Sequence, residues 1–297
     1  MKRLTRLVLI LLMTGALTAC GSAATALTPT TAAVVTQRLP TPETYPTAAV
    51  IPLPAPLQIN EKTDLPYNSY ELLDVFSPVS AGSWPVVIVL HGGDVTKASV
   101  SDLARAIAGL GAVVFAPSYD TSTGPADAFE DVACAVRFGR AHASQYGGKD
   151  DRVIVVGHSL GGLAGALMMF AGDEFKGDCL TRHGSAFPDA EVSLDGGFDP
   201  IPFAPPEVCK SEPDVCLKID PFTYISRKPI RNGVRFVLLV GEYPSAQKNT
   251  QAFRDALQEA GYEASLAQIP GLNHNEMRFP GPETLSSIMS VLQPPAP

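Results

Sequence analysis

The stretch Arg152–Phe170, RVIVVGHSLGGLAGALMMF, limits the possible folds more than any other part of this 297-residue chain. Its first part is an unbroken run of valine and isoleucine, which is typical of a strand buried on both faces of a sheet. Its last part is rich in leucine, alanine and methionine, which favour a helix. Between them, Gly157–Gly161 places a serine between two glycines. The sequence therefore predicts a buried strand that turns sharply into a helix at Ser159.

A serine at such a turn is suited to act as a nucleophile. The flanking glycines leave room for the chain to reverse, and the hydroxyl of Ser159 is then held above the edge of the sheet. The helix that follows directs its free N–H groups and its positive dipole end toward the same point, which favours an oxyanion there. We expect the N–H of Leu160 to be one donor. A glycine-rich helix start with an incidental serine is the competing interpretation, and the strand before the motif weighs against it.

The rest of the chain predicts strands and helices in alternation. We expect strands over 70–76, 85–90, 112–116, 152–156, 191–194, 234–240 and 263–269, and helices over 99–110, 126–146, 160–171, 247–260 and 283–292. Alternation of this kind is typical of a mostly parallel sheet with helices on both faces. Residues 58–297 have the length of one large α/β domain.

Four stretches together resemble one known superfamily. They are YELLDVFSP (70–78), VVIVLHGG (86–93), DVACAVRFGRAHASQYGGKDDRVIVVGHSLGG (131–162) and PGLNHNEM (270–277). In these stretches the chain is similar to the α/β-hydrolases, and among them to secreted carboxylesterases and feruloyl-esterase-like enzymes. The resemblance implies the α/β-hydrolase fold with a short cap insertion, here residues 198–229. It also implies hydrolysis of carboxylic esters through an acyl-enzyme, with no metal or organic cofactor.

The resemblance assigns the general base and the second oxyanion donor. His274 lies on a loop after the last expected strand, where the loop overhangs the C-terminal edge of the sheet and can reach the nucleophile. Gly93 follows the strand over 85–90 and is the expected partner of Leu160 in the oxyanion hole, with Asp94 as the alternative. His91 has a structural role in that loop.

The other three histidines are not expected to act as the base. His142 lies in a helical pattern and His183 in a cysteine-flanked insertion, so both are predicted to be surface residues. His158 is held beside the nucleophile without room to deprotonate it.

The acid of the triad is left open among three residues. The superfamily usually places an aspartate three residues after the glycine that ends the penultimate strand, and here that position holds Pro244. Glu242 could substitute for it, or the acid could follow the preceding strand, as in chlorophyllase-like and platelet-activating-factor acetylhydrolase-like relatives. We favour Asp195, which stands in an LDGG turn, over Glu242, and keep Asp199 as the third candidate.

The first 57 residues predict export and a membrane anchor. Residues 1–19 have a basic start and an apolar run too short for a stable span, and they end in LTA before Cys20. LTAC resembles the lipobox of bacterial lipoproteins, which implies acylation of Cys20 and attachment to the outer side of a cell membrane or to the outer membrane. Residues 20–57 are rich in threonine, alanine and proline, with only Arg38 and Glu43 charged, so they predict a tether.

Charge limits the classes of binding partner, and cysteine content indicates the state of the cysteines. The chain carries 22 basic and 30 acidic residues, which argues against nucleic acid as a partner. Beyond Cys20, four cysteines remain in an exported domain, which favours two disulfides over a metal site. Of the three possible pairings we favour Cys209 with Cys216 and Cys134 with Cys179.

The predicted function is therefore that of a surface-anchored serine esterase. The short cap predicts an open site for small or polymeric esters and does not identify the ester. Two alternatives remain, namely a peptidase or amidase on the same fold, and an inactive hydrolase-like binding module.

Overall fold

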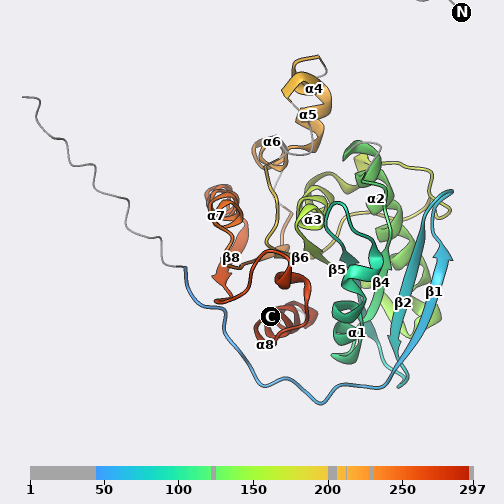
Figure 1. Ribbon diagram of the computed structural model, residues 1–297. Coiled ribbons are helices and arrows are strands. Elements are labelled where there is room, and N and C mark those ends of the chain that lie inside the picture. The colour runs from blue at the N-terminus through green and yellow to red at the C-terminus, as the bar shows by residue number, and fades with distance from the viewer. Residues whose placement is uncertain (1–44, 122–124, 200–205, 212, 228–230, 294–297) are drawn as a thin grey trace, which may run out of the picture. The chain divides into compact units, whose positions relative to one another are not determined.

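The computed structural model describes residues 45–121, 125–199, 206–211, 213–227 and 231–293 (Figure 1). By its internal contacts the chain divides into residues 1–43 and 44–297, and the described residues all belong to the second unit. The predicted signal segment, Cys20 and most of the predicted tether lie outside the described residues. No helix in the described ranges is long and apolar enough to cross a membrane.

A single eight-stranded sheet forms the centre of the described unit, in the order β1-β2-β4-β3-β5-β6-β7-β8. Strands β3 to β8 run parallel, and β2 is antiparallel to both β1 and β4. The strands are β1 (Ile59–Pro66), β2 (Leu72–Pro78), β3 (Trp84–Leu90), β4 (Val113–Pro117), β5 (Gly148–His158), β6 (Ala190–Leu194), β7 (Arg235–Val240) and β8 (Glu263–Gln268).

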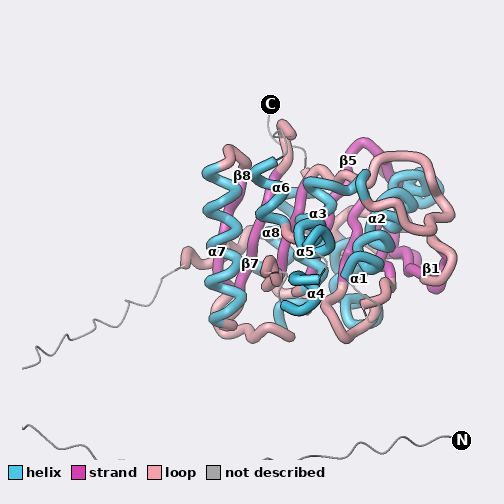
Figure 2. Tube along the Cα trace, turned by 90° about the horizontal axis from the view of Figure 1, so that it is seen from above, coloured by secondary structure: helices cyan, strands magenta, loops and turns pink. Residues whose placement is uncertain are grey.

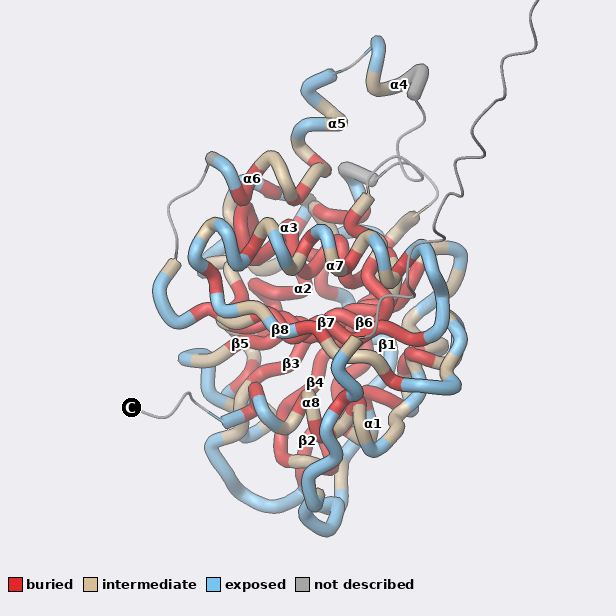
Figure 3. The backbone as a smooth tube through the Cα atoms, turned by 90° about the vertical axis from the view of Figure 1, so that its left-hand side faces the viewer, coloured by how far each residue is buried: buried red, intermediate tan, exposed pale blue. Residues whose placement is uncertain are grey.

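Helices cover both faces of this sheet and alternate with the strands along the chain (Figure 2). On one face lie α2 (Pro125–His142), α3 (Leu160–Ala171) and α7 (Pro244–Glu259), and on the other lie α1 (Ser101–Gly109) and α8 (Pro282–Leu292) (Figure 3). The predicted fold class, a mostly parallel sheet with helices on both faces, is confirmed.

The central strand β5 shows why this sequence forms a two-sided core. Val153 and Val155 pack into the cluster under α2 and α3, whereas Ile154 and Val156 pack into the cluster under α1 and α8. Because successive side chains of a strand point to opposite faces, a continuous apolar run buries both faces of the sheet. All four side chains are fully buried.

The described residues of the insertion between β6 and β7 form three short helices, α4 (Pro206–Ser211), α5 (Pro213–Ile219) and α6 (Pro221–Arg227). Each begins with proline, which is favoured in the first turn of a helix. The α6 helix packs on α3 and α7, while α4 and α5 project away from the sheet (Figure 1). A disulfide between Cys209 and Cys216 joins α4 to α5, and a second joins Cys134 of α2 to Cys179. Both bonds follow the favoured pairing.

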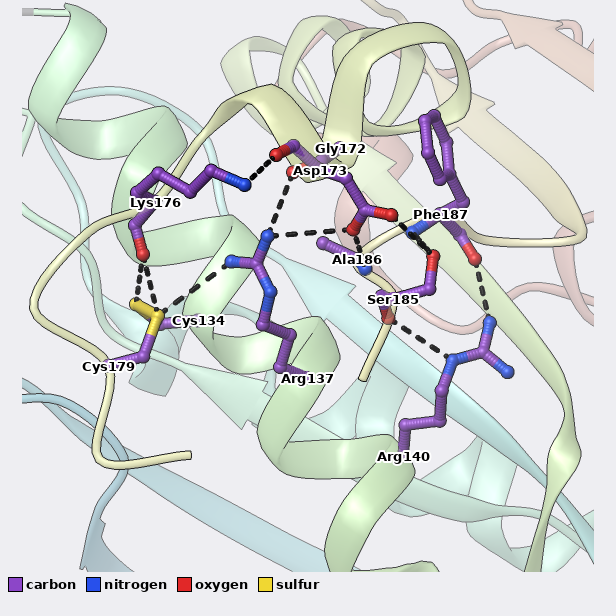
Figure 4. Close-up of polar contacts among 10 residues, drawn as sticks. All are labelled: Cys134, Arg137, Arg140, Gly172, Asp173, Lys176, Cys179, Ser185, Ala186 and Phe187. Carbon is purple, nitrogen blue, oxygen red and sulfur yellow. Dashed lines mark hydrogen bonds and ion pairs between the residues drawn. A yellow bond between two sulfur atoms is a disulfide. The ribbon is translucent and has the colours of Figure 1, made fainter. Parts of the chain in front are cut away.

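The segment after α3 is fastened to α2 by two arginines as well as by the second disulfide (Figure 4). Arg137 is buried and donates to the carbonyl of Gly172, with the Asp173 carboxylate 3.5 Å away. Arg140 donates to the carbonyls of Ser185 and Phe187 at 3.3 and 2.7 Å. Burial lowers the pKa of Arg137, and Asp173 partly offsets this effect. These contacts fix a segment that has little regular structure of its own.

Two features at the start of the unit differ from the sequence predictions. The edge strand β1 was not predicted, because its sequence INEKTDLP has exposed charged residues and no clear apolar alternation. Residues 45–57, assigned from the sequence to the tether, lie along the domain. Ala48 donates to the carbonyl of Gln268 in β8, Ile51 donates to the hydroxyl of Ser286, and Leu57 donates to the carbonyl of Gly109. The extended backbone of residues 45–57 thus forms hydrogen bonds with carbonyl and hydroxyl groups of the domain.

Candidate active site

The turn between β5 and α3 holds Ser159 in a conformation that is rare for a residue with a side chain, with φ 55° and ψ −117°. The two glycines of the motif have no space for a larger residue. A Cβ atom on Gly157 would lie 2.2 Å from the carbonyl oxygen of Gly161, and one on Gly161 would lie 2.6 Å from that of Leu90. Strain of this kind persists only where the surroundings impose it, and it is frequent at functional sites.

A chain of hydrogen bonds joins this serine to a histidine and an aspartate. The Nε2 atom of His274 lies 3.0 Å from the Oγ of Ser159, and its Nδ1 atom lies 3.2 Å from Oδ2 of Asp195. A carboxylate only accepts, so Nδ1 carries the proton and Nε2 is free to accept the serine proton. The ends of β5 and β6 place Ser159 beside Asp195, because the N–H of Ser159 donates to the carbonyl of Leu194.

Asp195 is held rigidly. It is completely buried, and its Oδ1 atom accepts the N–H of Gly241 at 2.8 Å. Its φ of 50° lies in the left-handed region, and two glycines follow it in the sequence. The carboxylate is therefore oriented by the neighbouring strand β7 rather than by the histidine alone.

The other two candidate acids make different contacts. Glu242 accepts the N–H of Gly271 through Oε1 at 2.8 Å, and its own N–H donates to the carbonyl of Leu272. Glu242 therefore supports the loop that carries His274. Asp199 lines the cavity beside Ser159. Of the three candidates, Asp195 is the one hydrogen-bonded to the imidazole.

The loop after β3 lies directly against the serine turn. A Cβ atom on Gly92 would lie 3.3 Å from the Cβ of Ser159, and one on Gly93 would lie 3.8 Å from a methyl group of Leu160. The N–H of Leu160 is the first of α3, so it has no partner four residues earlier in the helix. Asp94, the alternative to Gly93, has a positive φ of 58°. The two expected oxyanion donors are thus neighbours.

Two buried histidines adjoin the site. His91 stacks on Tyr119 with ring centroids 4.1 Å apart, and its Nδ1 donates to the carbonyl of Gly92 at 2.7 Å. His158 has its Nε2 atom 2.7 Å from the carbonyl oxygen of His274. Burial lowers the pKa of both His91 and His158 to about 4, so both are neutral at pH 7.

The remaining two histidines lie outside the site. His142 stacks on Phe138 within α2, and His183 is exposed in the segment after α3. Within the described ranges, no three histidine, cysteine, aspartate or glutamate side chains are grouped so that they could hold a metal ion.

A cavity of about 290 Å³ opens beside the serine and the histidine. The start of α7 supplies one of its walls through Tyr243, Ser245, Ala246 and Asn249, which sequence reasoning did not identify. The ring of Tyr243 lies 5.2 Å from that of His274, centroid to centroid, and is about half exposed. The position of these residues after β7, at the C-terminal edge of the sheet, is the signal that could have indicated them.

Comparison with known proteins places these features in context. The family model BD-FAE matches residues 73–193, which include the loop after β3 and the serine turn. The search of curated proteins found no match.

Several solved esterase structures share the fold. Esterase B from Lactobacillus rhamnosis aligns with a TM-score of 0.63 and 16% identity, covering 81% of this chain and 86% of that one. A truncated carbohydrate esterase from gut microbiota gives 0.62 and 17%, covering 80% and 96%. The butyrate-bound esterase Est2 from the Planctomycetes species Thermogutta terrifontis gives 0.58 and 18%, covering 69% and 80%. By its strand order and its similarity to these solved structures, the chain has the fold of the α/β-hydrolase esterases.

Proposed function

We propose that this protein is a serine hydrolase that cleaves carboxylic esters through an acyl-enzyme. One observation carries the proposal, namely the continuous hydrogen-bonded path from the Oγ of Ser159 through His274 to the buried carboxylate of Asp195. A nucleophile, a base and a group that orients the base are the three parts that such catalysis requires. The similarity to solved esterases supports the same chemistry.

Acylation is the first half of the reaction. Nε2 of His274 takes the proton of Ser159, and the serine oxygen bonds to the ester carbonyl carbon. The negative oxygen that forms is received by the N–H groups of Leu160 and Gly93, at the positive end of α3. The carboxylate of Asp195 stabilises the imidazolium. The imidazolium then gives its proton to the leaving alkoxide, the carbon–oxygen bond breaks, and an alcohol departs.

Deacylation repeats these steps with water. His274 takes one proton from a water molecule, whose oxygen attacks the acyl carbon and forms a second oxyanion in the same hole. The proton then passes to the oxygen of Ser159 as the acyl bond breaks, so a carboxylic acid leaves and the serine is restored. The net reaction consumes one water for each ester.

The volume of the cavity favours short acyl groups. Its space of about 290 Å³ accommodates a short acyl chain beside Ser159 and His274. Two structural neighbours are described as a carbohydrate esterase and as an esterase with bound butyrate. We therefore include short-chain acyl esters, and those of sugars, in the proposed range of substrates.

We also propose that the protein is exported and held at a membrane surface by acyl chains on Cys20. The order of basic, apolar and small residues before this cysteine supports the proposal. Mass spectrometry of the mature N-terminus tests it. We expect an acylated Cys20 as the first residue, and an unmodified N-terminus at any other position would contradict the proposal.

The activity is tested with p-nitrophenyl esters of increasing chain length and the full chain purified in detergent. We expect turnover to be highest for short acyl groups and to fall to background in Ser159→Ala. Ser290→Ala, a serine on the exposed side of α8, is the matched control and should keep wild-type turnover. No ester turnover in the wild type would refute the proposal, and so would equal activity in Ser159→Ala. Turnover of peptide substrates alone would assign the site to amide hydrolysis instead.

A further inference from the structure

His158 lies immediately before the nucleophile, yet the triad does not use it. It is the last residue of β5 and is only 3% exposed. Its Nε2 atom lies 2.7 Å from the backbone carbonyl oxygen of His274, 116 residues further along the chain. The side chain of His158 thus links the end of β5, next to the nucleophile, to the backbone of His274, the general base.

The chemistry of this contact fixes the state of the ring. A carbonyl oxygen only accepts hydrogen bonds, so the Nε2 atom of His158 carries a proton and donates. Burial keeps the ring neutral, so its Nδ1 atom has no proton. That Nδ1 atom has no hydrogen-bond partner among the described residues. It faces Gly92, where a Cβ atom would come within 3.1 Å of it.

His158 therefore adjoins three parts of the site, namely the nucleophile, the loop after β3 and the general base. It precedes Ser159 in the sequence, packs on the loop that carries Gly93, and binds the backbone of His274. Its ring centroid lies 4.8 Å from that of His274, in a tilted arrangement that leaves the Nδ1 and Nε2 atoms of His274 free for Asp195 and Ser159.

The base loop has a second anchor on its other side. Glu242 accepts the N–H of Gly271, and the N–H of Glu242 donates to the carbonyl of Leu272. These contacts hold the loop before His274, and they leave the carbonyl of His274 itself to His158. Holding that carbonyl restricts the backbone rotation that would swing the imidazole away from Ser159.

We propose that His158 is a positioning residue for catalysis, which acts by donating a hydrogen bond from Nε2 to the backbone carbonyl of the general base. The inference rests on the proposed ester hydrolysis. Displacement of a reacting group by about 1 Å can cost roughly 100-fold in rate. Loss of this bond should therefore lower kcat by about that factor while KM changes little, because His158 does not line the substrate cavity.

The test compares three variants of the full chain in p-nitrophenyl ester hydrolysis. His158→Gln keeps an N–H donor near the position of Nε2, His158→Asn is polar but too short to reach, and His158→Leu removes the donor. We expect His158→Leu and His158→Asn to lower kcat about 100-fold, and His158→Gln to stay within about tenfold of wild type. Leu103→Ala, a core change in α1 on the opposite face of the sheet, is the control for lost stability.

Each outcome has a distinct meaning. Equal loss of kcat in His158→Gln, His158→Asn and His158→Leu would overturn the proposal, as would a wild-type kcat in His158→Leu or His158→Asn. A loss that appears in KM rather than kcat would also overturn it. If the Leu variant does not fold, the comparison of Gln with Asn decides alone. Lack of turnover in the wild type would instead refute the proposed ester hydrolysis.

Discussion

Replacement of Asp195 by asparagine should reverse the direction of the hydrogen bond to the base. Oδ1 of Asp195 accepts the N–H of Gly241 at 2.8 Å, so the amide oxygen of an asparagine would take that position. The amide N–H₂ would then face Nδ1 of His274, where Oδ2 now lies at 3.2 Å. An N–H donor forces Nδ1 to accept, and the imidazole proton moves to Nε2.

The wrong tautomer cannot deprotonate Ser159. With its proton on Nε2, His274 donates to the serine oxygen across the present 3.0 Å contact instead of accepting from it. A triad blocked in this way loses roughly 10⁴-fold in kcat, or about 5.4 kcal/mol of transition-state stabilisation. KM should change little, because the carboxylate orients the base rather than the substrate.

Glu242→Gln is the matched control, because it changes a carboxylate on the other side of the same loop. Its amide oxygen can still accept the N–H of Gly271, so we expect less than about a tenfold loss in kcat. Both variants are assayed for ester turnover, and their melting temperatures are compared. Activity in Asp195→Asn within a few-fold of wild type, or a larger loss in Glu242→Gln, would refute the assignment of the acid.

Three further predictions concern the turn and the stability of the domain. Gly157→Ala should abolish turnover and lower the melting temperature, because its Cβ would lie 2.2 Å from the Gly161 carbonyl oxygen; wild-type turnover would contradict the account of the turn. Glu191 is fully buried without a hydrogen-bond partner among the described residues, and burial raises its pKa well above the usual value. Ionisation of this glutamate in the unfolded state therefore lowers the free energy of unfolding as pH rises above about 4.3, the usual pKa of a glutamate. Urea unfolding should show the advantage of Glu191→Gln over wild type growing as pH rises above about 5, and a constant difference would contradict the neutral state. Replacing Cys134 and Cys179 by serine opens a loop of 45 residues and should lower the free energy of unfolding by about 4 kcal/mol; a loss below about 1 kcal/mol would show that the two arginines of α2 suffice to fix the segment.

Local patterns in the sequence predicted the serine turn, and physical reasons explain why the acid was harder to identify. The turn around Ser159 depends on adjacent residues, so a short stretch specifies it. The acid depends on which strand end meets the loop of His274, which is a tertiary relation. Pro244 begins α7 where an aspartate was expected, and the structure brings Asp195 from the neighbouring strand end to the histidine instead.

The same distinction between local sequence signals and tertiary contacts applies to the fold. The buried parallel strands were predicted because continuous apolar runs are a strong local signal. The edge strand β1 and residues 45–57 were not assigned to the sheet or to its surroundings, because polar and proline-rich sequences carry no such signal. The three short helices of the cap were likewise predicted only as an insertion.

The central claim is that Ser159 is the nucleophile of an ester hydrolase, and covalent labelling tests it most directly. The full chain is treated with a fluorophosphonate while p-nitrophenyl ester turnover is followed, and the modified residue is located by peptide mass spectrometry. We expect one label per chain, on Ser159, with activity lost in proportion to labelling and no label in Ser159→Ala. Full loss of activity with Ser159 unlabelled, or a label on Ser159 that leaves turnover intact, would contradict it.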